Sequence, residues 1–393
     1  MTTAIVIGGG IAGCSTAYAL AKRGIAVTLL ERRDKLASEA SGNPLAMLYP
    51  KLSIKPSMQS TLALQGFEFT LNLLQYLLAS HQFFDACGLI QLAFNAREQA
   101  NQATLADLYQ LQLLNTNAAS EIAGITLKMV GLYLPQAGWV RPAALCEALC
   151  SAVLVSRKTI THALKIEKIA NRWRVFDAQN NEFEADTVVI CNANDIKQFT
   201  QCASIEIISV RGQVNFFAAN NVSKYIKAII CSDHFLSPAV AGLHSIGTSY
   251  APNDANLNLC EADTLQNLNA LRKISPELFA SLQVSVVNGR VAWRSQTPDY
   301  MPLAGQLLDD RKLSTNPPRY NANPADLPWL QGLYVNAGHG SKGMITAPLC
   351  GELIACLATN SALPLDTKLA SRLNPSRFLL KALGLKQLAS SLY

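Results

Sequence analysis

The chain has 393 residues, of which 50% are apolar and 15% charged, and its net charge is +6. This length suits two or three domains with sizeable cores, and the low charge content excludes a disordered polyelectrolyte. The apolar stretch 4–21 is interrupted by glycines and is followed, not preceded, by Lys22 and Arg23, which excludes a secretory signal or a membrane span. We therefore expect a soluble, cytoplasmic protein that makes no contact with a membrane.

Ten cysteines are scattered along the chain without any C-x-x-C pair. That pattern suits neither a zinc site nor a disulfide framework in a chain of this size. We therefore expect no metal site, and mostly buried, reduced thiols.

The first thirty-one residues predict a strand, a turn, a helix and a second strand. An apolar run at 4–7 leads through glycines into a helical segment at 11–23, which ends at Gly24, and an apolar run at 25–30 precedes Glu31. Farther along, leucines and aromatics at helical spacing predict helices over 62–78 and 105–114. Pro142 begins a further predicted helix over 142–153.

The second half of the chain predicts mostly strands. Apolar runs predict strands at 173–176 and 187–191 with a turn at 182–186, and short β-type runs between 205 and 250 predict an antiparallel sheet. A strand at 333–336, a glycine-rich turn at 338–343 and a helix at 344–357 follow. Because glycine turns stand near both ends of the chain, we expect a nucleotide-binding domain assembled from separate segments, with the β-rich middle inserted as a substrate domain.

The glycines after the first strand are spaced as in a dinucleotide-binding turn. Gly8, Gly10 and Gly13 match G-x-G-x-x-G between a strand and a helix. Glu31, eighteen residues farther on, ends the second strand and can accept hydrogen bonds from a ribose. The glycines allow the backbone to approach a pyrophosphate at the start of the helix. NAD and S-adenosylmethionine use similar turns, so this motif predicts a nucleotide without choosing FAD.

Longer motifs supply a family resemblance that covers nearly the whole chain in order. A resemblance to the D-amino-acid oxidase/glycine oxidase superfamily of flavoenzymes is carried by SEASGN at 38–43, RGQ at 211–213, TPD at 297–299 and GHGSKG at 338–343. A narrower resemblance is to the FAD-dependent half of the MnmC family, which takes part in making tRNA 5-methylaminomethyl-2-thiouridine. It is carried by ASGN at 40–43, LYP at 48–50, PQAGW at 135–139, VRGQ at 210–213, IGTSY at 246–250 and LNPSR at 373–377.

The resemblance implies an α/β fold in which a FAD-binding Rossmann-like domain of discontinuous segments carries an inserted antiparallel-sheet α+β substrate domain, as in D-amino-acid oxidase. The FAD-binding domain would comprise residues 1–55, 135–204 and 285–365, and the substrate domain residues 56–134 and 205–284. A basic C-terminal tail, residues 366–393, follows with five basic residues against one acid. Its cations would contact tRNA phosphates, or serve solubility if the apolar side chains of 373–380 dock the tail into the core.

The reaction implied by the resemblance is the oxidation by FAD of a C–N bond next to a carboxylate. For the MnmC-like half, this removes the carboxymethyl group from 5-carboxymethylaminomethyl-(2-thio)uridine at the tRNA wobble position and gives the aminomethyl form and glyoxylate. No cysteine lies between Cys260 and Cys350, where some sarcosine oxidase-like relatives attach flavin, so we expect FAD to be non-covalent. Two alternatives stay open: an oxidase or dehydrogenase of free glycine, sarcosine or a D-amino acid, and a non-catalytic, flavin-bound RNA-binding module.

The resemblance also implies which residues form the site. Arg294 precedes the TPD motif as the carboxylate-binding arginine does in glycine oxidase-like relatives, so it is the expected clamp for the substrate carboxylate, with Arg290 as the runner-up. Lys342 is expected to reinforce the charge near the flavin or to touch that carboxylate. The residues expected to bind FAD are Gly8, Gly10, Ile11, Ala12, Gly13, Glu31, Arg32, Ser41, Gly42, Asn43, Gly338, Gly340, Ser341, Lys342, Gly343 and Met344.

The chain departs from the family pattern in three places. MnmC proteins carry a methyltransferase domain ahead of the flavin domain, whereas the dinucleotide strand here starts at Ala4, so we expect methylation to need a separate methyltransferase chain. Asn192-Ala193-Asn194 stands where a glycine is expected after the strand at 187–191. Lys342 stands where an arginine is common.

Overall fold

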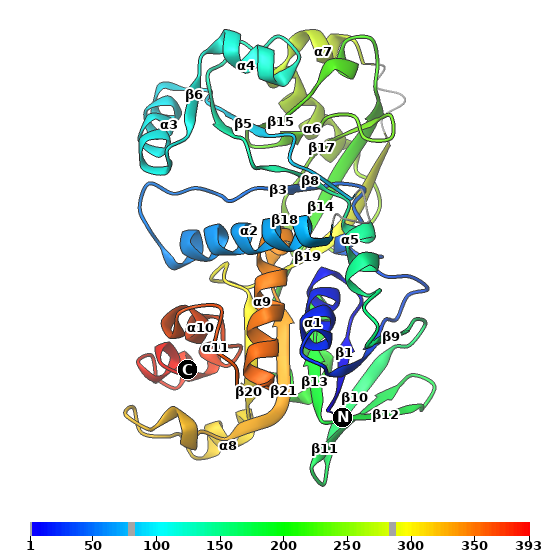
Figure 1. Ribbon diagram of the computed structural model, residues 1–393, viewed down its shortest axis with the longest axis vertical. Helices are drawn as coiled ribbons and strands as arrows, with labels where there is room; N and C mark the ends of the chain where they lie inside the picture. The colour runs from blue at the N-terminus through cyan, green and yellow to red at the C-terminus, as the bar shows by residue number, and fades with distance from the viewer. Residues whose placement is uncertain (1, 78–82, 283–287) are drawn as a thin grey trace.

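A computed structural model describes residues 2–77, 83–282 and 288–393. The last residue of the helix predicted over 62–78 and the expected domain border between residues 284 and 285 lie outside these ranges. The chain is elongated, and its two halves are built around different sheets, with the long helix α2 (Met58–Leu77) lying between them (Figure 1).

A six-stranded sheet forms the half that holds both chain ends. Its strands, in spatial order, are β20 (Leu303–Leu308), β21 (Trp329–Ala337), β13 (Thr187–Ile190), β1 (Thr3–Ile7), β2 (Ala26–Leu30) and β9 (Val155–Lys158). Every neighbouring pair is parallel except β20 with β21. Parallel strands need covering on both faces, and this sheet is covered on both.

Alternate side chains of the central strand enter two different cores. Ala4 and Val6 of β1 pack under helices α1 (Ile11–Ala21), α5 (Pro142–Leu149) and α9 (Gly343–Ala358). Ile5 and Ile7 face the other way, towards the antiparallel strands β10 (Ala163–Ile169), β11 (Arg172–Asp177) and β12 (Glu182–Ala185). The continuous apolar run of β1 therefore belongs to a strand that is buried on both faces.

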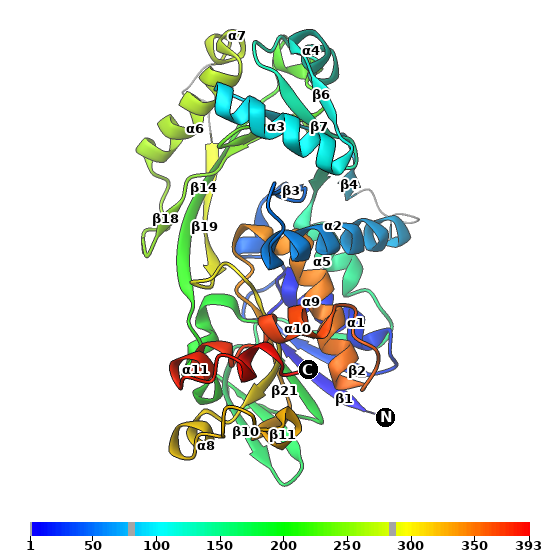
Figure 2. The same ribbon diagram turned by 90° about the vertical axis from the view of Figure 1, so that its left-hand side faces the viewer.

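The second half is built on a nine-stranded sheet. Its strands are β18 (Ala251–Pro252), β14 (Ile208–Ala218), β17 (Leu243–Gly247), β16 (Phe235–Leu236), β15 (Ile229–Cys231), β5 (Leu89–Leu92), β7 (Gly131–Leu134) and β6 (Gln112–Leu114), and β19 (Asn288–Gln296) pairs with β14. Helices α3 (Ala96–Tyr109), α4 (Thr116–Ala123), α6 (Glu261–Ile274) and α7 (Pro276–Ala280) cover it. Figure 2 shows β14 and β19 running side by side from this half towards the six-stranded sheet. A small sheet of β3 (Ala46–Leu48), β8 (Gly138–Val140) and β4 (Phe84–Asp85) lies between the halves.

The structure confirms the fold class and corrects three of the predicted elements. Residues 182–186 are not a turn, because Glu182–Ala185 forms β12 against β11. The helix predicted over 105–114 ends at Tyr109, where Gln110 takes a left-handed φ of 53°, and residues 112–114 form β6 instead. The helix predicted over 142–153 ends at Leu149. In the first two cases pairing with a neighbouring strand, β11 or β7, replaced the predicted turn and the end of the predicted helix.

The sheets suggest a division of the chain that differs at one border from the expected one. Residues 285–365 were expected to lie in the nucleotide-binding domain, but β19 pairs with β14 along its whole length in the nine-stranded sheet. We propose a division that follows the sheets and places residues 288–296 with the substrate domain.

The C-terminal segment is part of the core of the first half. Helices α10 (Thr367–Leu373) and α11 (Arg377–Ala382) lie beside α9 and β20, next to α8 (Asp310–Thr315) (Figure 1). Leu373 and Leu380 are fully buried, and so is Arg377. The expectation that all the cations of this segment face tRNA or solvent is therefore wrong for Arg377, which is enclosed by the docked helices.

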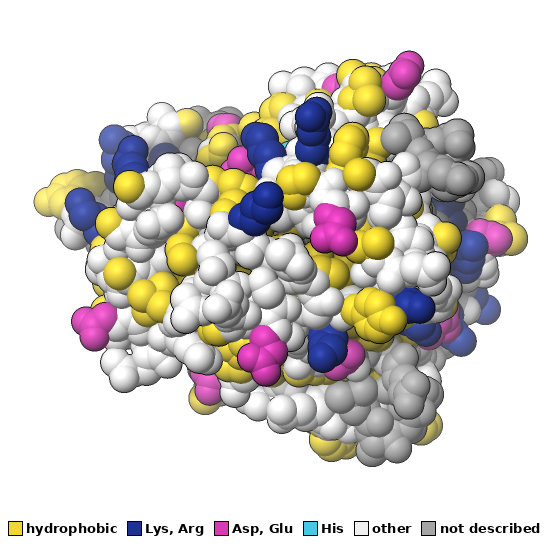
Figure 3. Space-filling model, turned by 90° about the horizontal axis from the view of Figure 1, so that it is seen from above, with side chains coloured by type: hydrophobic (Ala, Val, Ile, Leu, Met, Phe, Trp, Pro, Cys, Tyr) yellow, Lys and Arg dark blue, Asp and Glu magenta, His cyan; other side chains and the backbone are white. Residues whose placement is uncertain are grey.

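Two surface observations bear on partners. None of the helices in the described ranges is both long and apolar enough to cross a membrane. Figure 3 shows the end of the molecule near α4 and α7, where Lys and Arg side chains stand among uncharged and apolar ones with scattered acidic groups.

Candidate functional site

A cavity of about 620 Å³ lies where the two halves meet. Its wall is built from residues 7–12, 30–32, 38–41, 45–47, 191–195, 231–235, 247–248, 293–295 and 336–345, with further single residues that include Asn43, Tyr49, Lys51 and Tyr250. Most of the predicted site residues line this cavity: Gly8, Gly10, Ile11, Ala12, Glu31, Arg32, Ser41, Asn43, Arg294, Gly338, Gly340, Ser341, Lys342, Gly343 and Met344. Gly13, Gly42 and Arg290 are not part of its wall.

The first glycine turn brings the N-terminus of α1 to the cavity. Gly8 has a φ of +111°, and a Cβ there would lie 2.7 Å from the carbonyl oxygen of Cys191. A Cβ on Gly13 would lie 1.8 Å from the carbonyl oxygen of Gly8, so only glycine allows α1 to start this close to β1. Ser41 Oγ accepts a hydrogen bond of 3.0 Å from the amide of Ile11. The helix start is therefore a ready anion site, with one hydroxyl placed beside it.

Glu31 lies at the end of β2 and lines the same part of the cavity. Its two carboxylate oxygens accept hydrogen bonds of 2.7 Å from the amides of Gly9 and Arg33. Each oxygen keeps a further lone pair, so the carboxylate can still accept a ribose hydroxyl. Arg32 pairs with Glu39 at 2.6 Å and with Asp195 at 2.8 Å, which ties the segment after β2 to the segment after β13.

The segment Asn192-Ala193-Asn194, where the family pattern has a glycine, forms part of the cavity wall. Both polar side-chain atoms of Asn192 and the Oδ1 of Asn194 are buried without a hydrogen-bond partner among the described residues. Ala193 has a left-handed φ of 53°, the conformation for which glycine was expected. Buried polar groups without partners are rare in proteins, and because these three atoms belong to residues that line the cavity, a group bound there could supply their partners. The sequence flagged this segment only as a departure, because the burial of the two asparagines depends on the fold.

These features fit FAD, the group implied by the family. The glycine turn offers amides and the start of a helix to a pyrophosphate, Glu31 offers a carboxylate to a ribose, and the two asparagines offer unpaired donors and acceptors. The same cavity is lined by the second glycine turn, so one dinucleotide could contact both turns.

The second glycine turn places the N-terminus of α9 on the cavity. His339 is held in a network there, with Nε2 2.9 Å from Asn336 Oδ1 and Nδ1 2.8 Å from Thr346 Oγ1. Asn336 in turn donates to Thr16 Oγ1 at 2.9 Å, which joins the network to α1. Burial lowers the pKa of His339 to about 3, so the ring is neutral. His339 thus holds the two helix starts in register and is not placed as a proton donor.

Two lysines contribute positive charge to the wall. Burial lowers the pKa of Lys342, and the charge of Lys51 lowers it further. Neither lysine forms an ion pair with a carboxylate of the described residues. Lys51 was not predicted, since it stands in the segment after the LYP motif with no pattern to single it out.

Arg294 reaches the cavity from β19, where its side chain is half-buried. Its Nη2 donates to Thr248 Oγ1 at 2.6 Å and to the carbonyl of Ser249 at 2.9 Å. A Cβ on Gly212 would lie 2.0 Å from this nitrogen, so the glycine of the RGQ motif makes room for the guanidinium. Burial lowers the pKa of Arg294, and no carboxylate of the described chain pairs with it. A guanidinium keeps its proton even so, and can bind an anion from the cavity.

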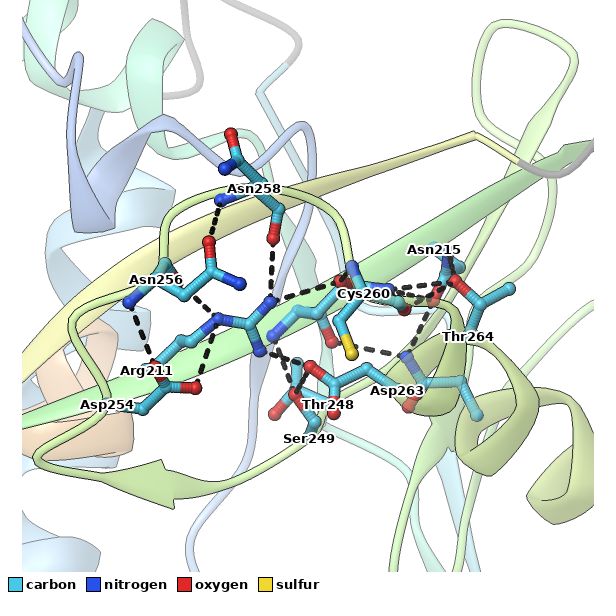
Figure 4. Close-up of polar contacts among 12 residues, drawn as sticks. Arg211, Asn215, Thr248, Ser249, Asp254, Asn256, Asn258, Cys260, Asp263 and Thr264 are labelled. Carbon is cyan, nitrogen blue, oxygen red and sulfur yellow. Dashed lines mark hydrogen bonds and ion pairs between the residues drawn. The ribbon is translucent and has the colours of Figure 1, made fainter.

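The loop that supports Arg294 is held from the other side by Arg211 (Figure 4). Arg211 is buried, forms an ion pair with Asp263 and donates to the carbonyls of Asn256 and Asn258. Asp263 also accepts a hydrogen bond of 3.1 Å from Ser249 Oγ. The RGQ motif therefore fixes the backbone whose carbonyl receives Arg294.

Arg290, the runner-up to Arg294 as the carboxylate clamp, is not among the residues that line the cavity. It donates to Asn43 Oδ1 at 2.9 Å and to the carbonyls of Ser38 and Glu39. Its guanidinium lies 2.6 Å from where a Cβ on Gly42 would stand. We infer that Arg290 positions the loop of residues 38–43 against α1, because its hydrogen-bonding groups are directed to that loop.

The chain matches the family described as FAD dependent oxidoreductase over residues 3–357. It is 40% identical to the tRNA 5-methylaminomethyl-2-thiouridine biosynthesis bifunctional protein MnmC of Methylobacillus flagellatus, over 99% of this chain and 61% of that protein. It is also 40% identical to the protein of the same name from Pseudomonas syringae pv. syringae, over 97% of this chain and 59% of that one. The chain thus spans about three fifths of the length of these relatives.

Solved structures show the same fold at low sequence identity. Glycine oxidase from Geobacillus kaustophilus superposes with a TM-score of 0.78 at 20% identity, over 96% of this chain and 99% of that one. L-proline dehydrogenase from P. horikoshii superposes with a TM-score of 0.77 at 19% identity, over 97% and 98%. Together with the match over residues 3–357, the glycine turns and the cavity that joins them show that this chain belongs to the FAD dependent oxidoreductase family.

Proposed function

We propose that this enzyme uses FAD to oxidise the secondary amine of 5-carboxymethylaminomethyl-(2-thio)uridine at the wobble position of tRNA, giving the aminomethyl form and glyoxylate. The observation that carries the proposal is Arg294, a half-buried cation without a carboxylate partner in the described chain, in the same cavity as the two glycine turns. A guanidinium in that position fits a substrate carboxylate. The name of the relatives, which make a methylaminomethyl uridine in tRNA, supports the choice of substrate.

Residues of both glycine turns would hold FAD without a covalent bond. We assign the pyrophosphate to the amides of Gly10 and Ala12, on either side of the Ile11 amide that donates to Ser41, and a ribose to Glu31. Ser41, Asn43 and the 338–344 segment would contact the rest of the cofactor. When bound, FAD supplies the acceptor for the two electrons and the hydrogen that leave the substrate carbon next to nitrogen.

The residues at the other end of the cavity would orient the substrate and tune its charge. Arg294 would bind both carboxylate oxygens and so place the methylene carbon. The positive charges of Arg294, Lys342 and Lys51 would lower the pKa of the substrate amine, which favours the neutral form that can be oxidised. Water then adds to the C=N bond of the oxidised substrate, and cleavage releases glyoxylate and the primary amine on the uridine. This sequence of steps needs no dedicated base among the residues of the cavity.

The test is mass spectrometry of tRNA nucleosides from a strain that lacks this protein. We expect 5-carboxymethylaminomethyluridine to accumulate, and a plasmid copy of the wild-type gene, but not of Arg294→Ala, to remove it. A purified enzyme whose flavin is reduced by glycine or sarcosine, but not by the undermodified tRNA, would favour a free amino-acid oxidase instead.

We also propose a cytoplasmic protein whose partner is tRNA, and a separate methyltransferase chain for the later methylation. Phosphate contacts would come from exposed lysines such as Lys224 and Lys227 and from the half-buried Arg372 and Lys381, since Arg377 is enclosed. Such contacts make affinity for tRNA fall as salt concentration rises.

A further inference from the structure

Tyr250 is an aromatic side chain at the rim of the cavity, directly beside Arg294. It is 52% exposed and is part of the cavity wall. The carbonyl that receives the Arg294 guanidinium belongs to Ser249, the residue before it in the chain. The Tyr250 hydroxyl accepts a hydrogen bond of 3.1 Å from Gln296 Nε2. The ring is therefore anchored at its polar end while much of its surface stays open.

A second aromatic residue, Trp293, stands next to Arg294 in the sequence of β19. It lines the cavity, and its indole N–H donates to the carbonyl of Asp254 at 2.8 Å. Asp254 belongs to the loop that Arg211 holds, as its carboxylate lies 3.6 Å from Arg211 Nε. Both aromatic side chains are thus fixed by hydrogen bonds at their polar atoms, and their rings are left for apolar contact.

The dimensions of the proposed substrate bring its base to this point. Three atoms, CH₂–NH–CH₂, separate the carboxylate carbon from C5 of the uracil, a span of roughly 5 Å. A carboxylate held by Arg294 therefore leaves the pyrimidine ring within reach of the residue that follows Ser249. Proteins that recognise unpaired RNA bases stack them on aromatic side chains.

We propose that Tyr250 is a specificity-determining residue that stacks on the pyrimidine ring of the substrate. This inference rests on the proposed function and adds the subsite that distinguishes a modified nucleoside from a small amino acid. A free glycine or sarcosine, bound by Arg294 alone, has no group to place on this surface.

The test compares two substrates in single-turnover reduction of the flavin-loaded enzyme. One is the nucleoside 5-carboxymethylaminomethyluridine. The other is N-methylglycine (sarcosine), which has the amine and the carboxylate but no base. The variants are Tyr250→Leu, which removes the aromatic face, and Tyr250→Phe, which keeps it. Tyr320→Leu, at a residue 68% exposed and outside the cavity wall, is the matched control.

We expect Tyr250→Leu to weaken the apparent affinity for the nucleoside at least about tenfold more than it weakens that for N-methylglycine, because a stacked base contributes that much. Tyr250→Phe should stay within a few-fold of wild type. The product 5-aminomethyluridine, which lacks the carboxylate, should also bind more weakly to Tyr250→Leu than to Tyr250→Phe or wild type. Equal losses for both substrates, or a Phe variant as weak as the Leu variant, would overturn the stacking role. If the wild-type enzyme is reduced by N-methylglycine but neither by the nucleoside nor by tRNA, the proposed function itself fails, whatever Tyr250 does.

Discussion

The enclosed cation Arg377 allows a sharp prediction, because its removal should destabilise the whole nucleotide-binding half. Its guanidinium is 0% exposed and donates to both carboxylate oxygens of Asp299, at 3.1 and 2.8 Å. It also donates to the carbonyls of Met301, Pro302, Leu373 and Asn374. Arg377→Ala leaves those carbonyls and the Asp299 carboxylate without their main partner.

The size of the effect follows from the burial of the pair. Removing one partner of a buried, hydrogen-bonded ion pair costs about 3–5 kcal/mol. Unfolding entropy near 60 °C is about 2.1 cal/mol/K per residue, so for 393 residues the melting temperature should fall by about 4–6 °C. Lys381→Ala is the matched control, because Lys381 lies 4.0 Å from the same carboxylate but its side chain is 31% exposed. Its loss should cost less than about 1 kcal/mol.

The assay is thermal unfolding of the flavin-loaded variants, repeated between pH 3 and pH 7. Burial by itself opposes ionisation of Asp299, but the hydrogen bonds and charge of Arg377 outweigh it, so the pKa of Asp299 is lowered in the folded state. The pair therefore stabilises the protein above about pH 4, the ordinary range of an aspartate, and this stabilisation is lost as pH falls through the lowered pKa. The acid-induced loss should be smaller in Arg377→Ala. Equal melting temperatures for Arg377→Ala and Lys381→Ala at pH 7 would refute the docked arrangement of α11.

Three further predictions concern the site. Arg294→Ala should leave flavin content unchanged and weaken substrate binding in single-turnover reduction by about 10- to 150-fold, the equivalent of about 1.5–3 kcal/mol for a charge-assisted contact. Arg290→Ala should instead lower flavin retention, because it loosens the 38–43 loop. If Arg290→Ala weakened substrate binding and Arg294→Ala lowered flavin retention, the two roles would have to be exchanged. Glu31→Ala should weaken FAD binding by about 1.5–3 kcal/mol, measured by titration of the apoprotein, and an unchanged affinity would remove Glu31 from the ribose site. Ala193→Gly should raise the free energy of unfolding by up to about 1 kcal/mol in thermal melts, since it relieves a left-handed φ of 53°, and a destabilised variant would show that the Cβ packing outweighs that strain.

The local pattern of the chain determined the nucleotide site. The spacing of Gly8, Gly10 and Gly13 between two apolar runs predicts the turn and the start of α1, because the closest approach in this turn, of Gly13 to the carbonyl of Gly8, is made within the motif itself. The same holds for Glu31 at the end of β2 and for the second glycine turn before α9. The geometry of such short turns depends on the spacing of a few neighbouring residues, so these elements and their residues could be predicted from the sequence.

The tertiary structure alone decided what each arginine does. Arg211, Arg290, Arg294 and Arg377 have the same chemistry, and Arg290 and Arg294 stand four residues apart on one strand. Their distinguishing partners come from segments 45 to 252 residues away. Arg211 and Arg290 therefore hold loops, Arg294 faces the cavity, and Arg377 joins a docked helix to Asp299. Sequence spacing carries no information about such long-range contacts. Burial converts the same charge into a structural pair or into a free binding group, depending on whether a carboxylate of the chain lies beside it.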